Sequence, residues 1–504
     1  MSYILLLLYL AVILYIVGKA KFFSIDSLSR KSLILLFVLK FVFGTALLLI
    51  YTHHYTLKET SDVHKFFVDG VTLNNIFSQN PLHYFQLLFG INTDADYLQK
   101  YILGFNYWFL EDGSRVYNDT RTVIRFNSIA YFFSRGNMHI HTLFVCFLSF
   151  SGLVAIYKTV EKQFIDRKKL LLFAVFLVPG VLFWGSGILK EGIVLFTMGF
   201  LIYFYFKLIK NLNSFKYIFL FLLFCYFVML SKFYIVFAIM PAIGAGLLSK
   251  IPKLKNSNPV YTYLLATLIF LAGALIADYS NIYKPFAMLS KKEKDFKNVA
   301  WGGVFMDRTT IGDSIRINLE NKNILVEQEN GLFTLPKGSK YNRFANGRIV
   351  DSLIAPNDFK DLNVFITLVP SNSRINIPNL EPNIFSVIKN APVALFNSIF
   401  RPFIWEAKNI LSLIAAGENL LFLLAIALSL LFFKIPVKNN LDVWFFCLSF
   451  SSILFILIGL TTPVIGAIVR YKIPALPFFL MFVFLTFDME KIKTKFPFIY
   501  KWFN

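Results

Sequence analysis

The sequence predicts an all-α polytopic membrane protein with about eleven transmembrane helices and two outer soluble segments, the second partly β. Two observations support this fold class. Hydrophobic residues make up 57% of the 504 residues and the mean hydropathy is +0.62, which is higher than soluble globular proteins show. The net charge of +21 is concentrated in short Lys/Arg clusters between apolar runs. Cytoplasmic loops have this pattern, so we expect membrane lipids and no nucleic acid as partners.

The predicted transmembrane helices are apolar runs of roughly the 17–25 residues that cross a bilayer. Several runs are shorter than this, so their boundaries are loose. In chain order they are 3–18, 33–51, 138–157, 170–188, 192–207, 217–231, 233–249, 259–277, 418–434, 442–460 and 473–488.

The basic clusters predict the orientation of these helices. Clusters such as Lys19–Lys21, Arg167–Lys169 and Lys491–Lys495 follow alternate apolar runs, so all of them fall on one side if the chain crosses at every run. The positive-inside rule makes that side cytoplasmic. We therefore expect a multi-pass protein of the inner (cytoplasmic) membrane, with its N-terminus outside and its C-terminus in the cytoplasm.

The same alternation divides the chain into six parts. Residues 1–51 hold the first two helices, 52–137 the first outer segment, 138–277 the central helices, 278–390 the second outer segment, 391–490 an interfacial helix with the final helices, and 491–504 a cytoplasmic tail. We expect the first outer segment to be helical. Alternating residues in 314–335, with an Asn-Gly break, predict short β-hairpins in the second.

Five basic residues break the charge rule because they lie in very short outer turns. Charged residues at membrane depth are costly and often line a substrate pathway. Lys and Arg also extend readily to the interface, which leaves a purely anchoring role open. As a group they predict one cavity for a lipid phosphate or pyrophosphate at the outer leaflet. They are Lys190, Lys232, Arg401, Arg470 and Lys472.

The first outer segment supplies candidate catalytic carboxylates. Asp62 and Asp69 are seven residues apart, so a helix would place them on one face. Asp62 follows the second predicted span closely, which keeps it near the membrane surface. His64 lies beside it, so a divalent metal in this segment is an open alternative to ordinary interfacial histidines. We otherwise predict no metal site and no cofactor.

Three short motifs add a resemblance to known families. An early acidic residue in a large outer segment and the late run "VRYKIPALPFFLMFV" (469–483) resemble the C-type integral membrane glycosyltransferases, which use polyprenyl-phosphate-linked sugars. "FWGSGILKEG" (183–192) resembles bacterial envelope-polysaccharide membrane proteins, including O-antigen-polymerase-like ones. The resemblance covers most of the membrane region. It departs from the C-type pattern because the first outer segment follows the second helix rather than the first.

The resemblance implies an enzyme that transfers sugar from a polyprenyl-phosphate donor during envelope polysaccharide or glycoconjugate synthesis. Asp62 or Asp69 would accept the proton of the acceptor hydroxyl, and the basic residues would stabilise the departing phosphate. One alternative is a polysaccharide polymerase acting on a glycan lipid. Another is a non-enzymatic lipid or glycan transporter, or a membrane subunit of an export complex. The polymerase alternative rests on arginines in both outer segments: Arg115, Arg121, Arg125, Arg135, Arg308, Arg316, Arg343 and Arg348.

Overall fold

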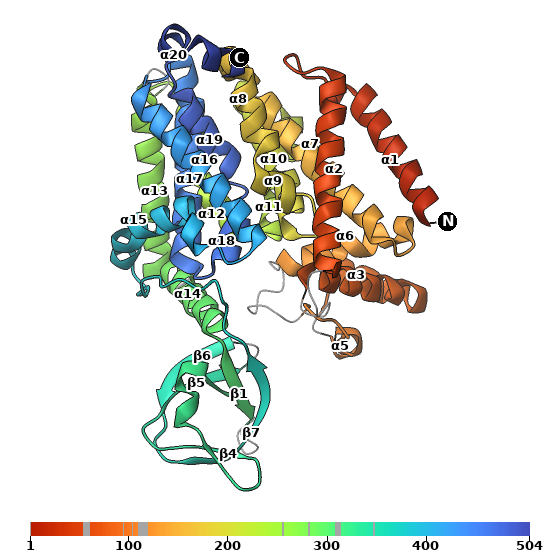
Figure 1. Ribbon diagram of the computed structural model, residues 1–504, viewed down its shortest axis with the longest axis vertical. Helices are drawn as coiled ribbons and strands as arrows, with labels where there is room; N and C mark the ends of the chain where they lie inside the picture. The colour runs from red at the N-terminus through yellow and green to blue at the C-terminus, as the bar shows by residue number, and fades with distance from the viewer. Residues whose placement is uncertain are drawn as a thin grey trace.

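The protein consists of a large helical bundle with a small β-sheet at one end (Figure 1). The computed structural model describes residues 2–53, 61–93, 95–102, 104–108, 119–254, 257–280, 283–307, 314–345 and 348–503. Both predicted outer segments lie at the lower end of the bundle in Figure 1, whereas α8, α20 and the C-terminus lie at the upper end. The two predicted outer segments therefore lie at one end of the bundle, and the C-terminus lies at the other.

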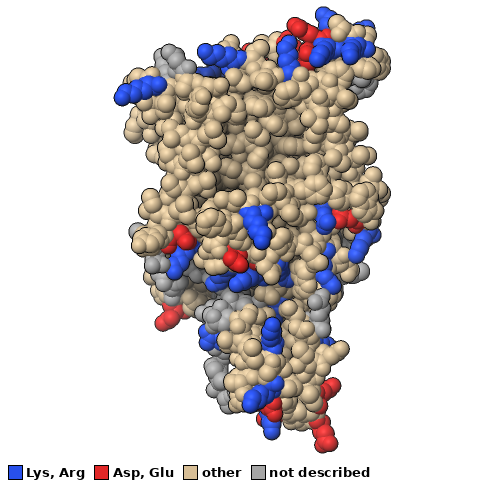
Figure 2. Space-filling view, turned by 90° about the vertical axis from the view of Figure 1, so that its left-hand side faces the viewer, with Lys and Arg blue, Asp and Glu red and all other residues tan. Residues whose placement is uncertain are grey.

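Within the described residues, seven helices are long and apolar enough to cross a membrane. The face of the molecule in Figure 2 has a wide band nearly free of Lys, Arg, Asp and Glu, with charged residues above and below it. This is the surface expected of a membrane protein, because charges in the hydrocarbon region are costly. The helices are α1 (Ser2–Lys19), α2 (Arg30–His53), α7 (Met138–Val160), α10 (Lys190–Lys210), α13 (Pro259–Tyr279), α16 (Ile410–Leu431) and α17 (Lys438–Thr461).

The remaining apolar runs form shorter or broken helices. The pair α18 (Ile465–Tyr471) and α19 (Leu476–Leu485) is bent by 68° and counts as an eighth crossing if it forms one span. α11 (Phe215–Ser231) and α12 (Phe233–Leu248) are apolar but short. By length and composition, seven or eight of the described helices can cross a membrane. The larger number of about eleven transmembrane helices remains a prediction.

The predicted span at 170–188 is not one helix. It is divided into α8 (Lys168–Leu172), η4 (Phe173–Leu177) and α9 (Pro179–Trp184), followed by a turn that leads into α10. Pro179 has no N–H to continue the helix, so the chain restarts there. The turn after α9 leads to Lys190, the first residue of α10.

Small residues allow the central helices to approach closely. A Cβ on Gly152 of α7 would overlap the backbone of α10 at Leu195, and one on Gly199 would overlap the backbone of Gly152. In a bilayer the lipid tails are as apolar as the helix surfaces, so the hydrophobic effect does little to associate helices. Close van der Waals packing at small residues stabilises their association instead. The resulting core joins α1, α2, α7, α10, α12, α17 and α19.

The first outer segment is helical, as predicted. It contains α3 (Asp62–Gln79), α4 (Pro81–Phe89), α5 (Asp96–Ile102) and α6 (Asp119–Ser134). Their apolar faces enclose a separate core around the fully buried Trp108. α4 begins after an Asn80 cap and ends at Gly90, which adopts positive φ, the usual signals for a short helix.

The second outer segment is partly β, also as predicted. After α14 (Pro285–Trp301), seven antiparallel strands form a sheet in the order β3-β4-β7-β1-β2-β5-β6. An Asn330-Gly331 turn joins β3 to β4, with Gly331 at positive φ. The strands are β1 (Gly303–Asp307), β2 (Ser314–Ile317), β3 (Val326–Glu327), β4 (Phe333–Leu335), β5 (Lys340–Ala345), β6 (Arg348–Ile354) and β7 (Phe359–Leu368).

The predicted interfacial helix starts earlier than expected, inside the second outer segment. α15 (Ile384–Phe400) begins at an Asn383 cap and packs against α17, so the segment boundary at 390 falls within a helix. The short elements that complete the chain are η1 (Lys21–Phe23), η3 (Glu161–Arg167), η5 (Leu319–Ile324), η6 (Ile404–Glu406), α20 (Met489–Lys495) and α21 (Pro497–Phe503).

Candidate functional site

An ion-pair centre joins three distant parts of the chain at the lower end of the bundle. Arg470 donates one hydrogen bond to Asp62 Oδ2 at 2.8 Å and approaches Glu191 Oε2 at 3.5 Å. The Tyr107 hydroxyl donates to the other Asp62 oxygen at 2.9 Å. The Asp62 side chain remains 32% exposed, so its carboxylate is accessible while held in a fixed orientation.

Helix ends place these charges where the backbone favours them. Asp62 begins α3 and Glu191 lies in the first turn of α10, whereas Arg470 lies in the last turn of α18. The partial positive charge at a helix N-terminus stabilises a carboxylate, and the C-terminus stabilises a cation. The local helix boundaries therefore support the ion pairs.

Lys190 adds a second cation beside this centre. Its ammonium group donates to Asp119 Oδ1 and to Thr120 Oγ1, each at 2.8 Å. It also lies 5.7 Å from the centre of the Phe66 ring in α3. Lys190 thus links the first turn of α10 to the first turn of α6.

Lys232 is the third cation, and its environment is unusual. It lies between α11 and α12 and is only 3% exposed. Its ammonium group faces the rings of Tyr471 at 4.0 Å and Tyr234 at 5.5 Å. This ammonium group forms no hydrogen bond or ion pair with any residue that the structure describes. Aromatic faces attract a cation, but they leave its three N–H donors unused.

Tyr234 and Tyr471 bring the three cations into one group. Tyr471 lies within electrostatic range of Lys190, Lys232 and Arg470, and Tyr234 within range of Lys190 and Arg470. We call Asp62, Asp119, Lys190, Glu191, Lys232 and Arg470 the first cluster.

Buried polar atoms in and beside the first cluster lack partners. Among the described residues, no hydrogen-bond partner exists for Glu191 Oε1, Arg470 Nε or Tyr234 Oη. Buried polar groups are almost always paired. Such atoms are therefore available to a polar ligand.

Asp69 has a different environment from Asp62. It is fully buried, and its carboxylate accepts hydrogen bonds at 2.8 Å from the backbone N–H of Asn106, the Asn106 side chain and the backbone N–H of Tyr107. The two aspartates do share a helix face, since both contact Tyr107. Asp69 therefore fixes the position of residues 106 and 107, and with them the Tyr107 hydroxyl that donates to Asp62.

Two opposing influences act on the pKa of Asp62. Burial alone would raise it, but the Arg470 charge and the hydrogen bonds from Arg470 and Tyr107 lower it overall. Burial and the neighbouring Asp62 carboxylate raise the pKa of Tyr107. At neutral pH Asp62 is therefore an ionised acceptor and Tyr107 a neutral donor.

Arg401 and Lys472 do not join the first cluster. We expected all five basic residues to line one cavity, but Arg401 pairs with Glu406 at 3.3 Å, and Lys472 donates to Asn419 Oδ1 at 2.6 Å. Lys472 follows Arg470 by two residues at the end of α18, so its side chain leaves the helix on the opposite side. We call Arg401, Glu406, Glu418, Asn419 and Lys472 the second cluster.

Unpaired atoms alone do not distinguish the clusters, because Glu418 Oε1 and Arg401 Nε also lack partners among the described residues. The two lysines do distinguish them. The Lys472 ammonium has three oxygen acceptors, Asn419 Oδ1 and the carbonyls of Ile399 and Arg401, at 2.6–3.5 Å. All three of its donors are used.

Several residues of the site were not identified from the sequence. Glu191, Tyr234 and Tyr471 are within two residues of the basic residues chosen for their unusual positions, so inspecting those neighbours would have found them. Tyr107 and Asp119 had no such signal, because they are far from the other members in sequence. Only the tertiary structure brings them to Asp62 and Lys190.

Metal binding finds no support in the described part of the chain. Within it, no group of three or more His, Cys, Asp and Glu side chains is arranged to hold a metal ion. His64 Nδ1 lies 3.1 Å from Ser61 Oγ.

The chain has no match among family models, curated proteins or solved structures with which it was compared. The geometry of the first cluster is therefore the basis for assigning a function.

Proposed function

We propose that the protein is a glycosyltransferase of the inner membrane that takes its sugar from a polyprenyl-phosphate-linked donor at the outer face. The observation that carries this proposal is the composition of the first cluster. An accessible, ionised carboxylate lies against Arg470, with Lys190 and Lys232 in the same group at one end of the bundle. A lipid phosphate also lies at the membrane surface, so its charge would meet these cations there.

The chemistry requires one proton acceptor and one anion-stabilising group. The acceptor oxygen forms a bond to the anomeric carbon of the sugar, and the bond from that carbon to the phosphate oxygen breaks. Asp62 takes the proton of the acceptor hydroxyl, which requires it to be ionised beforehand. Lys190, Lys232 and Arg470 stabilise the polyprenyl phosphate that leaves.

Asp62 is the better base of the two aspartates. The carboxylate of Asp69 is enclosed and already accepts three hydrogen bonds from residues 106 and 107. We therefore assign Asp69 the role of a positioning residue that acts through Tyr107.

No described observation favours the polymerase alternative. Arg121 and Arg125 stack against Trp108 and donate to carbonyls of their own segment. Arg316 donates to the carbonyls of Asn298 and Gly302. These contacts lie within the first or within the second outer segment and stabilise each one internally. Arg115, Arg308 and the side chain of Arg348 lie outside the described residues.

The test measures polyprenyl phosphate released in proteoliposomes, since this product forms whatever the acceptor is. Purified protein is supplied with a panel of polyprenyl-phosphate-linked sugars and an envelope extract as acceptor. We expect Asp62→Asn to lower the release rate by a factor of about 10²–10⁴ and to retain donor binding. Asp96→Asn, an exposed carboxylate of the same segment, is the matched control and should keep the wild-type rate. An Asp62→Asn variant with full activity would favour the non-enzymatic alternative.

The orientation has its own test. Lys162 is exposed in η3, which directly precedes α8, and α8 lies at the end of the bundle opposite the outer segments. A cysteine at this position, in a protein without native cysteines, should resist a membrane-impermeant maleimide in intact cells. A cysteine replacing the exposed Asp96 should react. The reverse pattern would place the first cluster on the cytoplasmic side.

A further inference from the structure

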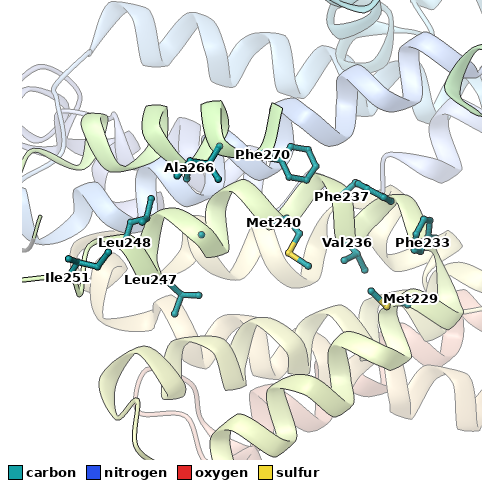
Figure 3. A pocket seen from close by; sticks show the side chains of 12 residues that line it. Met229, Phe233, Val236, Phe237, Met240, Leu247, Leu248, Ile251, Ala266 and Phe270 are labelled. Atoms are coloured by element: carbon teal, nitrogen blue, oxygen red, sulfur yellow. The ribbon is translucent and has the colours of Figure 1, made fainter. Parts of the chain in front are cut away.

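An apolar groove runs between α11, α12 and α13. It has a volume of about 660 Å³, and every described residue that lines it is apolar or glycine. Met229 and Phe233 lie at one end, and Leu248 and Ile251 lie at the other (Figure 3). Its side is open, because Met240, Leu247 and Ile269 are 38%, 40% and 54% exposed. A chain from the bilayer can therefore enter it sideways.

The groove is longer than one leaflet. Its lining follows α12 from Phe233 to Leu248, which is about 23 Å at 1.5 Å per residue. One leaflet of the hydrocarbon core is about 15 Å thick, half of the usual ~30 Å. An acyl chain of a phospholipid stays in one leaflet, so a longer chain is the better match.

One end of the groove lies at the turn between α11 and α12, which carries Lys232 of the first cluster. Met229 and Phe233 are close to Lys232 in sequence, and the Lys232 ammonium lies between Tyr234 and Tyr471 without a hydrogen bond to a described residue. An apolar groove that ends at the turn carrying this lysine fits an amphiphile with one anionic end. The methionine and phenylalanine side chains can adapt to a methyl-branched chain.

We propose that this groove holds the isoprenoid chain of the donor, with the donor phosphate at Lys232. This inference rests on the proposed function for the identity of the lipid and adds where its chain lies. It predicts that the protein distinguishes long polyprenyl phosphates from short ones. Since lipid is as apolar as the groove, this preference comes from packing rather than from removal of water.

Gly244 offers a direct way to block the groove. A Cβ built there meets only Ala266 Cβ, at 3.7 Å. Both residues line the groove, so Gly244→Phe should fill part of it. Gly273→Phe is the matched control, because Gly273 lies in α13, is exposed, has no neighbour within 4 Å of its Cβ and does not line the groove. Lys232→Met removes the cation at the end.

Binding of undecaprenyl phosphate and geranyl phosphate is measured for each purified full-length protein by native mass spectrometry. We expect Gly244→Phe to weaken undecaprenyl phosphate binding by about tenfold, or ~1.4 kcal/mol, and to leave geranyl phosphate binding unchanged. Lys232→Met should weaken both, and Gly273→Phe neither. Equal undecaprenyl phosphate binding by wild type and Gly244→Phe would overturn the inference, as would an equal loss for both ligands.

A competition measurement with a phospholipid tests whether the groove prefers the polyprenyl donor to ordinary membrane lipid. Phosphatidylglycerol should compete poorly with undecaprenyl phosphate, and its retention should not depend on Gly244. Equal competition would make the groove a site for bulk lipid and overturn the inference. If long-chain binding depends on Gly244 but no sugar transfer is found, the groove stands and the glycosyltransferase proposal fails. If sugar transfer depends on Asp62 but not on Gly244, the glycosyltransferase proposal stands and the groove proposal fails.

Discussion

Two buried lysines at turns between helices show how differently the same residue can be used. Lys472, between α18 and α19, is fully buried, and its ammonium group donates to three oxygen atoms. Lys232, between α11 and α12, is almost as buried, yet only two tyrosine rings face its ammonium group. The first lysine has its full set of acceptors, and the second does not.

This difference separates a structural charge from a binding charge. Removing a buried cation from water is repaid only when its hydrogen bonds are replaced. The protein itself replaces them at Lys472, whereas at Lys232 a ligand anion can do so. Sequence position alone marks both lysines as equally unusual.

The largest expected effect is on stability, at Lys472. Lys472→Met leaves Asn419 Oδ1 and two carbonyls without their donor, and leaves Glu418 without its nearby cation. Breaking a buried charged network in this way costs about 3–5 kcal/mol. Lys232→Met loses contacts with aromatic rings worth about 1–2 kcal/mol. It also removes a buried charge whose hydrogen bonds the protein does not replace, so its net loss of stability should be smaller still. Thermal unfolding of both variants in detergent checks this order, and an equal loss of stability would remove the distinction between the two lysines.

The two aspartates of α3 allow a second, smaller comparison. Asp69→Asn places an amide N–H against backbone N–H groups of residues 106 and 107, which we expect to cost about 1–3 kcal/mol. Asp62→Asn should cost less stability and far more activity. Unfolding and transfer assays on both variants give the two quantities. A larger loss of activity in Asp69→Asn would move the base from Asp62 to Asp69.

Asp69 also has a test of its positioning role. Because it acts through Tyr107, Tyr107→Phe should reproduce part of its effect on activity while leaving the backbone hydrogen bonds intact. Adding Asp69→Asn to Tyr107→Phe should then lower activity less than Asp69→Asn does in the wild-type protein. Fully independent effects of the two substitutions would separate Asp69 from Tyr107.

The apolar helices and the strands of the second outer segment could be predicted from the sequence, because charge and hydropathy act locally. The basic clusters at Lys19–Lys21 and Lys491–Lys495 and the alternation at 314–317 depend only on neighbouring residues. The break at Pro179 was harder to predict, since the apolar run continues through it. The bend between α18 and α19 also lies within an apolar run.

The site was less predictable, because its contacts join distant positions. Arg470 meets Asp62 across 408 residues, and nothing local indicates that pairing. Arg470 and Lys472 looked equivalent in the sequence, but their two-residue spacing at a helix end sends them to different partners. The unsatisfied state of Lys232 is likewise visible only when its surroundings are known.

The smallest expected effect is that of pH on the Asp62–Arg470 pair. The folded protein lowers the pKa of Asp62 from its ordinary value of 3.8, so the folded state binds this proton less readily than the unfolded chain does. The pair therefore contributes its full stability above the unfolded pKa and loses it as the pH falls through the folded pKa. Between about pH 8 and 5, the difference in melting temperature between wild type and Asp62→Asn should stay constant, and it should shrink only below about pH 4. A wild-type advantage that grows between pH 7 and 5 would mean that burial outweighs Arg470 and raises this pKa. In that case Asp62 would be protonated under mildly acidic conditions and could not serve as the base there.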